Sequence, residues 1–221
     1  ILQVKSLGKF FPDADIFILN SCTVTHKSDN EAFSILNNAK KQNKNITNVL
    51  TGCIAQIEKD LLLENKNIDI VLGNDEKLNI SQHLNLKSNS KVKDIMDVEK
   101  FHKVLLTDTS KTRASLKIQD GCDNRCSYCI IPFARGKNRS AETDFILDQI
   151  KLYEDAGFKE IVLTGIHIGQ WGFDFSKKKS LLDLLEQIEE KTNISRFRLG
   201  SLNPLEINND MLNFLSQSEK F

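Results

Sequence analysis

The apolar residues in the first third of the chain form short runs that end in polar residues. Three segments show this pattern: DADIFILNSC at 13–22, NITNVLTGCIAQ at 45–56 and NIDIVLGND at 67–75. Such runs are typical of buried parallel strands. Between the first two runs, four apolar residues repeat at helical spacing: Ala32, Ile35, Leu36 and Ala39. Strands that alternate with helices predict a doubly wound parallel sheet over residues 1–84.

Residues 85–112 lose this periodicity and are rich in lysine, asparagine, serine and aspartate. Stretches of this composition between periodic segments are typical of loops. We therefore expect a linker between two domains, with one edge strand at KVLLTD, residues 103–108.

A second α/β series occupies residues 113–221. Its predicted strands are ASLKIQDGC at 114–122, EIVLTGI at 160–166 and RFRLGSL at 196–202, and each is followed by a helical pattern. The predicted helices cover 142–156, 180–191 and a segment that starts near 207. Three strand–helix units are too few to close a barrel, so we expect the first part of a larger (β/α) domain.

Composition and charge exclude several classes of protein. The chain has 221 residues, of which 40% are hydrophobic and 27% are charged, and no run approaches the roughly 18 apolar residues of a membrane span. It starts at Ile1 without the layout of a signal peptide, so we expect a chain that begins partway through a protein. The net charge of zero does not indicate a nucleic-acid partner.

One segment departs from this neutral balance. Residues 112–140 carry six basic side chains against two acidic ones, which are Arg113, Lys117, Arg125, Arg135, Lys137 and Arg139 against Asp120 and Asp123. This balance fits either a solvated loop or a place where an anionic substrate binds.

Three cysteines lie inside that basic segment, in the run GCDNRCSYCIIPFARGKNRS at 121–140. Cys122, Cys126 and Cys129 have the spacing C-x3-C-x2-C. Tetrahedral zinc and an electron-transfer iron–sulfur cluster both need four ligands. Three thiolates on a 4Fe–4S cluster would leave one iron open to a ligand from solution. Zinc and a plain electron-transfer cluster remain the alternatives on spacing alone.

The remaining two cysteines follow predicted strands. Cys22 and Cys53 lie where the first and second strands end, and functional groups of parallel sheets gather at that edge. They are either ligands of a second metal cluster or buried structural cysteines. Five cysteines in this arrangement do not suggest a disulfide framework, so we expect a reducing cytoplasm.

The chain resembles the radical SAM methylthiotransferases through four motifs that occur in the order found in that family. They are NSCTVTHKSD at 20–29, TGCIAQ at 51–56, GCDNRCSYCIIPFARGKNRS at 121–140 and EIVLTGIHIG at 160–169. The resemblance implies a Rossmann-like domain with an auxiliary 4Fe–4S cluster, then a radical SAM (β/α) partial barrel. A small RNA-binding β domain and the first auxiliary-cluster cysteine of the family are expected outside this chain.

The resemblance also implies cofactors and roles for residues. Cys122, Cys126 and Cys129 would hold the cluster that binds S-adenosylmethionine (SAM), and Cys22 and Cys53 would help to hold the auxiliary cluster. Three residues are expected at the cofactor: Tyr128 near the adenine, Gly165 in the strand-end segment, and Arg198 on a strand face. Arg198 would bind the SAM carboxylate or pair with a protein carboxylate. Arg135, Lys137 and Arg139 would contact tRNA phosphates, bind the SAM carboxylate or solvate the loop.

CTVT at 22–25 together with LTGIHIG at 163–169 is most similar to the branch that acts on N6-threonylcarbamoyladenosine 37 of tRNA. The reaction implied is insertion of sulfur at C2 of this nucleoside and its methylation. The branches for isopentenyladenosine tRNA and for a ribosomal protein are the alternatives. An electron-transfer protein and a zinc or RNA-binding module are the rivals from other classes. The family further implies tRNA and a flavodoxin or ferredoxin as partners, a monomer, and no membrane association.

Overall fold

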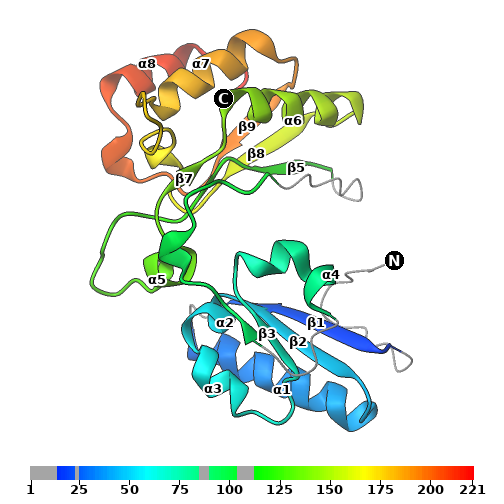
Figure 1. The fold of residues 1–221 in the computed structure, drawn as a ribbon. Helices are drawn as coiled ribbons and strands as arrows, with labels where there is room; N and C mark the ends of the chain where they lie inside the picture. Colours follow the sequence, from blue (N-terminus) through cyan, green and yellow to red (C-terminus); the bar gives the residue numbers. More distant parts are fainter. Residues whose placement is uncertain (1–13, 23–24, 85–89, 104–111) are drawn as a thin grey trace. The chain divides into compact units, whose positions relative to one another are not determined.

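The computed structural model describes residues 14–22, 25–84, 90–103 and 112–221, and they form two compact units (Figure 1). The first unit comprises Ile1–Val98 together with Cys126–Gly136. The second comprises Glu99–Arg125 together with Lys137–Phe221. The cysteine run is therefore shared between the units, because Cys122 belongs to the second unit and the other two cysteines to the first.

The first unit contains a parallel sheet in the order β1-β2-β3-β4. The three predicted strands are present as β1 (Ile16–Ser21), β2 (Thr47–Gly52) and β3 (Ile70–Leu72). The fourth strand, β4 (Ser90–Lys91), lies in the segment that we expected to be a linker. Its side chains carry no apolar signal because it is a two-residue edge strand. The expected strand at 103–108 lies almost wholly outside the described residues.

Helices cover both faces of this sheet, as the doubly wound prediction requires. The helix α1 (His26–Gln42) packs Leu36 against Leu50 and Val71, with α2 (Cys53–Ile57) and α3 (Lys59–Leu63) in the same core cluster. On the other face, Val49, Ile70 and Leu72 form a separate cluster with α4 (Ile80–His83). Consecutive strand residues thus point to opposite buried faces, which is why each strand contains an unbroken apolar run.

The second unit contains a three-stranded parallel sheet in the order β5-β8-β9. Its strands are β5 (Ala114–Lys117), β8 (Glu160–Thr164) and β9 (Arg196–Leu199). The predicted strand at 114–122 is broken at Ile118, and its second part, β6 (Gln119–Asp120), pairs antiparallel with β7 (Arg139–Ser140). This small hairpin connects the two ends of the cysteine run within the second unit.

Three helices lie on one face of the second sheet (Figure 1). They are α6 (Thr143–Asp155), α7 (Leu181–Lys191) and α8 (Asn209–Gln217), close to the predicted bounds. Ser180 and Asp183 form a capping box at the start of α7, with both reciprocal hydrogen bonds present. Side chains alternate along β9, since Phe197 is buried under the helices and Arg198 is exposed.

Short elements complete the described residues. One more α-helix, α5 (Ile131–Arg135), follows the last cysteine. The 3-10 turns are η1 (Glu76–Asn79), η2 (Ile95–Asp97), η3 (Ile168–Gln170) and η4 (Pro204–Glu206). None of the helices in the described part of the chain has the length and apolar character needed to cross a membrane.

The packing of α1 on the first sheet gives a stability prediction. Leu36 is fully buried, whereas Leu63 is 49% exposed. Leu36→Ala leaves a cavity and is expected to lower the free energy of unfolding by about 2–5 kcal/mol. Leu63→Ala, the matched control, is expected to change it by about 0.5 kcal/mol or less. Urea denaturation of both variants measures the difference, and equal losses would contradict this packing.

Candidate functional site

The cysteine run follows β6 at the carboxyl end of the second sheet, which is where parallel β/α sheets place their functional groups. None of the three cysteines forms a disulfide, and none of them is fully buried. The backbone N–H of Cys129 donates to the carbonyl of Cys126 at 3.0 Å, so these two residues form one tight turn just before α5. Tyr128 between them is 89% exposed, and its expected contact with adenine stays a prediction.

The three thiols suit an iron–sulfur cluster in kind and in number, because none is in a disulfide and each can ligate iron as a thiolate. Within the described residues, however, no group of three or more histidine, cysteine, aspartate or glutamate side chains is gathered in a way that could hold a metal ion. The donor set thus fits the implied cluster in chemical type, and the role of these cysteines as its ligands stays a prediction.

The buried side chain of Gln119 connects the base of the cysteine loop to the loop after β8. Its amide N–H groups donate to the carbonyl of Gly121 and to the Asn138 side chain, both at 2.6 Å. Its carbonyl oxygen accepts from the backbone N–H groups of Ile166 at 2.9 Å and His167 at 2.8 Å. Because a buried amide is costly to leave unpaired, these four bonds fix both loops in one arrangement.

Gly165 lies against this amide. A Cβ atom at position 165 would stand 2.8 Å from Oε1 of Gln119 and 2.9 Å from Cγ2 of Ile168. Both distances are shorter than normal van der Waals contact, so only glycine fits here without displacing Gln119. This packing accounts for Gly165 within the protein itself, and its expected contact with the cofactor stays a prediction.

His167 is buried between the first cysteine and a carboxylate. Its Nδ1 lies 3.8 Å from Sγ of Cys122 and 3.3 Å from Nδ2 of Asn124, while its Nε2 contacts the Glu206 carboxylate. Glu206 lies on η4 after β9, and a Cβ atom on Gly169 would collide with it. Histidine and glutamate thus come from the ends of neighbouring strands and meet beside the cysteine loop.

The sequence does not indicate that His167 and Glu206 form a pair, because they are 39 residues apart along the chain. The available signal is the capping pattern Asn203-Pro-Leu-Glu206, in which the Asn203 side chain accepts from Leu205 N–H and Glu206 accepts from Asn203 N–H. That pattern predicts a turn at the strand end but not the partner of its carboxylate.

A second set of polar contacts holds the far end of the cysteine run. Asn138 donates its backbone N–H to Asp123 at 3.1 Å and its side-chain amide to Asp174 at 3.2 Å. Asp174 also accepts from the backbone N–H of Ser140 at 2.9 Å and from its hydroxyl at 2.5 Å. The loop after η3 therefore fixes both β7 and the start of the cysteine loop.

The three basic residues expected to contact RNA differ in exposure. Arg139 has a side chain that is only 4% exposed, lies 4.0 Å from the Asp120 carboxylate and donates to the carbonyl of Lys137 at 3.1 Å. The buried side chain of Arg139 therefore cannot contact a phosphate in this structure. Lys137 is exposed and Arg135 is half-buried at the end of α5, and their RNA contacts stay predictions.

Arg198 adopts the second of the two alternatives that the sequence left open. Its Nε donates to Oε1 of Glu160 at 2.5 Å, and Arg113 approaches the same oxygen at 3.6 Å. Glu160 begins β8, at the end of the sheet opposite the cysteine loop. Arg198 is thus engaged by a protein carboxylate, and contact with the SAM carboxylate would require this pair to separate.

Cys22 and Cys53 lie side by side at the carboxyl edge of the first sheet. The register pairs Ser21 with Gly52, so each cysteine is the next residue on its strand end. Gly52 has φ +102°, and a Cβ atom there would collide with the carbonyl of Ser21. Glycine therefore permits the close approach of the two strand ends. Cys22 is exposed and Cys53 is buried as the first residue of α2.

Comparison with known families finds matches to two separate parts of the chain. Residues 5–73 match the model described as "Uncharacterized protein family UPF0004", and residues 116–205 match the "Radical SAM superfamily". The first match covers most of the sheet that carries Cys22 and Cys53. The second covers the cysteine run, Gly165 and His167.

Individual relatives are similar over nearly the whole chain. The threonylcarbamoyladenosine tRNA methylthiotransferases MtaB of Bacillus subtilis and Aquifex aeolicus are both 34% identical, over 96% and 94% of this chain. The tRNA-2-methylthio-N(6)-dimethylallyladenosine synthase of Petrotoga mobilis is 32% identical over 94% of it. These matches cover 48%, 52% and 49% of the relatives, so the chain spans about half the length of the curated proteins it matches.

The contact between Gly165 and Gln119 gives a prediction with an internal control. Gly165→Ala is expected to displace the Gln119 amide and to lower the free energy of unfolding by about 1–3 kcal/mol. At Gly200, an added Cβ would meet only the carbonyl of Leu163 at 3.5 Å, which is ordinary contact. Gly200→Ala should therefore leave stability within about 1 kcal/mol of wild type. Thermal unfolding compares the two, and a neutral Gly165→Ala would count against the Gln119 arrangement.

The Arg198 guanidinium donates to Glu160 and holds the pKa of that carboxyl below its ordinary value, with Arg113 adding to the effect. A carboxyl whose pKa is lowered by folding stabilises the folded state at pH values above its ordinary pKa. This stabilisation is lost as the pH falls through the lowered pKa of the folded state. Arg198→Gln is expected to raise the pKa of Glu160 towards the ordinary value, and Arg113→Gln to raise it less. NMR titration of the Glu160 side chain measures both. No change in Arg198→Gln would disprove the pairing.

Proposed function

We propose that this chain, which belongs to the radical SAM methylthiotransferase family, forms part of an enzyme that methylthiolates N6-threonylcarbamoyladenosine 37 of tRNA at C2. The observation that carries the proposal is the run of three cysteines, none in a disulfide, that follows β6 at the carboxyl edge of a parallel β/α sheet. The segment that contains this run matches the radical SAM superfamily, which implies SAM and a 4Fe–4S cluster.

Cys122, Cys126 and Cys129 are the residues that would hold this cluster. The bound cluster would supply the electron for reductive cleavage of SAM, the radical chemistry that can activate an aromatic C–H bond. That chemistry suits C2 of adenosine because acid–base catalysis cannot readily remove this hydrogen.

The protein's own residues position the reacting groups. Gln119 fixes the carbonyl of Gly121, one residue before the first ligand, so the start of the cysteine loop cannot shift independently of the loop after β8. The Nδ1 atom of His167 lies against Sγ of Cys122, and the Glu206 carboxylate contacts Nε2 of the same imidazole. This packing keeps bulk water away from the inner face of Cys122.

The auxiliary site would use Cys22 and Cys53, which stand next to each other across β1 and β2. Two thiols are fewer than a 4Fe–4S cluster needs, so a further cysteine would have to come from outside this pair. The proposed role of this second cluster is to carry or supply the sulfur atom, while a second SAM molecule provides the methyl group.

The proposal includes the partners that this chemistry needs. The names of the MtaB relatives support tRNA as the substrate, and a flavodoxin or ferredoxin would supply the electron. A second candidate substrate is tRNA that carries dimethylallyladenosine, because a relative named for that activity is 32% identical, close to the 34% of the MtaB proteins. We propose that the enzyme works as a monomer in the cytoplasm.

The cysteine assignments predict two separable losses of activity. Cys126→Ala is expected to abolish SAM-dependent formation of 5′-deoxyadenosine under dithionite, because one cluster ligand is removed. Cys53→Ala is expected to retain 5′-deoxyadenosine formation and to lose the methylthiolated nucleoside. Chromatography of both products, with the protein made from its whole gene and reconstituted anaerobically, measures the two losses. Formation of 5′-deoxyadenosine by Cys126→Ala would refute the assignment, and a colourless protein with bound zinc would favour the rival class.

The substrate is tested by mass spectrometry of tRNA nucleosides from a strain that lacks the gene. Loss of the methylthiolated threonylcarbamoyl nucleoside alone is the expected result, and the whole gene on a plasmid should restore it. Loss of the methylthiolated dimethylallyl nucleoside instead would show that the second candidate is the substrate.

A further inference from the structure

A pocket of about 560 Å³ lies in the second unit outside the cysteine site. Two segments far apart in the sequence form most of its wall, Glu99–Lys103 before β5 and Asp174–Lys179 before α7. Each segment contributes two lysines and one phenylalanine to the lining. These six residues are Lys100, Phe101 and Lys103 with Phe175, Lys177 and Lys179. The volume is within the range of pockets that bind small molecules or single nucleotides.

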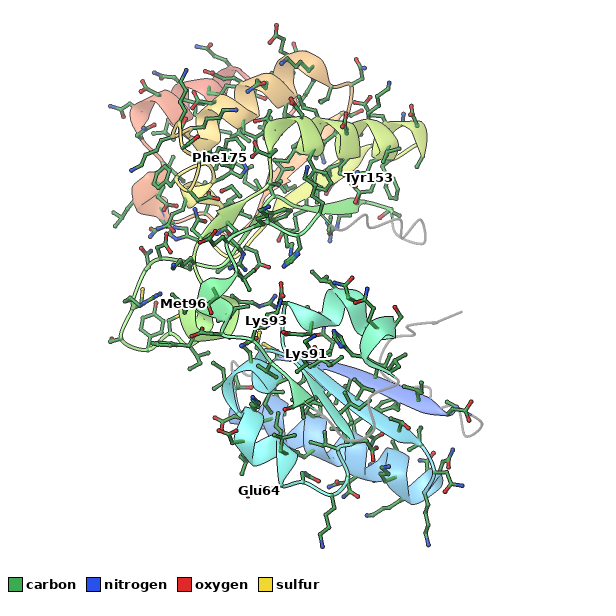
Figure 2. All side chains as sticks on the ribbon, viewed as in Figure 1. Glu64, Lys91, Lys93, Met96, Tyr153 and Phe175 are labelled. Atoms are coloured by element: carbon green, nitrogen blue, oxygen red, sulfur yellow. The ribbon has the colours of Figure 1, made fainter. Side chains whose placement is uncertain are left out.

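The aromatic ring of Phe175, labelled in Figure 2, lines this pocket. Phe175 packs edge-on against Trp171, with ring centroids 5.4 Å apart, and Trp171 is fully buried with its Nε1–H donating to the carbonyl of Ala141 at 2.9 Å. Lys179 stands 5.8 Å from the centroid of the Phe175 ring. A partly exposed ring fixed from behind by a buried tryptophan is a preorganised surface for stacking.

The charges at the pocket favour an anion. Lys100, Lys103 and Lys177 are exposed, and Lys179 is half-buried. They face three carboxylates, Glu99, Glu142 and Asp174, so four lysines against three acids leave a net charge of +1 at the pocket. Asn138 and Ser140 hold the Asp174 carboxylate in place with hydrogen bonds. Lysines that flank an aromatic ring are the combination that binds unpaired nucleotides, with phosphate on the ammonium groups and the base on the ring.

The pocket also adjoins the cysteine loop within the second unit. Asp174 and Ser140 line the pocket, and both are linked through Asn138 to Asp123, the residue after Cys122. A polynucleotide that delivers one base to the cysteine site would therefore pass close to this pocket. The same links provide a route by which occupation of the pocket would tighten the start of the cysteine loop.

We propose that this pocket binds an unpaired nucleotide of the substrate RNA, with its phosphate among the four lysines and its base stacked on Phe175. The proposal rests on the proposed function, because it takes tRNA as the substrate. Lys137 and the pocket then form two RNA contacts on either side of β7.

The test measures binding of a fluorescent anticodon stem–loop to the protein made from its whole gene, by anisotropy at several salt concentrations. Lys100→Gln/Lys103→Gln/Lys177→Gln is expected to raise Kd on the order of ten-fold or more at low salt. It should also reduce the slope of log Kd against log salt by about 2, since each lost contact to single-stranded RNA removes about 0.7. Glu142→Gln is expected to lower Kd.

Two controls separate the pocket from general charge and from folding. Lys44→Gln/Lys151→Gln/Lys191→Gln removes the same charge from exposed positions elsewhere and should leave Kd within about two-fold of wild type. Phe175→Leu is expected to weaken binding by between about five-fold and about a hundred-fold, and Phe175→Tyr to restore it, because stacking needs a ring. Circular dichroism confirms that each variant is folded.

Equal effects of the pocket and control lysine variants would overturn the proposal. So would full binding by Phe175→Leu, or competition by inorganic phosphate or free mononucleotides as strong as by the RNA. If the wild-type protein still methylthiolates tRNA in those cases, the proposed function stands without the pocket. If the wild-type protein binds no tRNA, both proposals fail.

Discussion

A single buried amide, the side chain of Gln119, determines how the candidate site of the second unit is arranged. It forms hydrogen bonds with the base of the cysteine loop, with Asn138 and with two backbone N–H groups after β8. Because each of these groups is withdrawn from water, loss of one bond would leave a polar atom unpaired. The loops that carry Cys122 and His167 are therefore two parts of one hydrogen-bonded structure, and Gly165 is the residue that allows the amide to fit.

The two units use the same geometric rule for their cysteines. Parallel strands end at a common edge, and the last residues of neighbouring strands are held a fixed distance apart by the ladder. In the first unit this rule places Cys22 beside Cys53, and Gly52 permits the close approach. In the second unit it brings Glu206 after β9 to His167 after β8. Residues that are distant in sequence thus meet without any long-range signal in the sequence.

The basic side chains of the second unit fall into two groups. Arg139 and Arg198 are both held by protein carboxylates, so these arginines contribute to the stability of the hairpin and of the sheet. Among the lysines that line the pocket, Lys103 lies over the ring of Phe145, and Lys179 lies near the Phe175 ring and donates to Thr143 at 3.4 Å. Lysine on a flexible stem contacts phosphate as a point charge, whereas an arginine held by a carboxylate is restricted in its orientation, which is why the proposed RNA contact uses the lysines.

Local patterns were enough to predict three strands of the first sheet, the three strands of the second, the helix α1 and the bounds of α7, because burial and helix periodicity are visible in the residues themselves. The cysteine run could be found in the same way, since its spacing carries its own chemistry. The pairing of Arg198 with Glu160, the burial of Arg139 and the contact of Glu206 with His167 follow from the folded chain alone. These outcomes depend on strand order and register, which bring together residues 38, 19 and 39 positions apart. The edge strand β4 also required the fold, since two residues paired on one side need no apolar side chains.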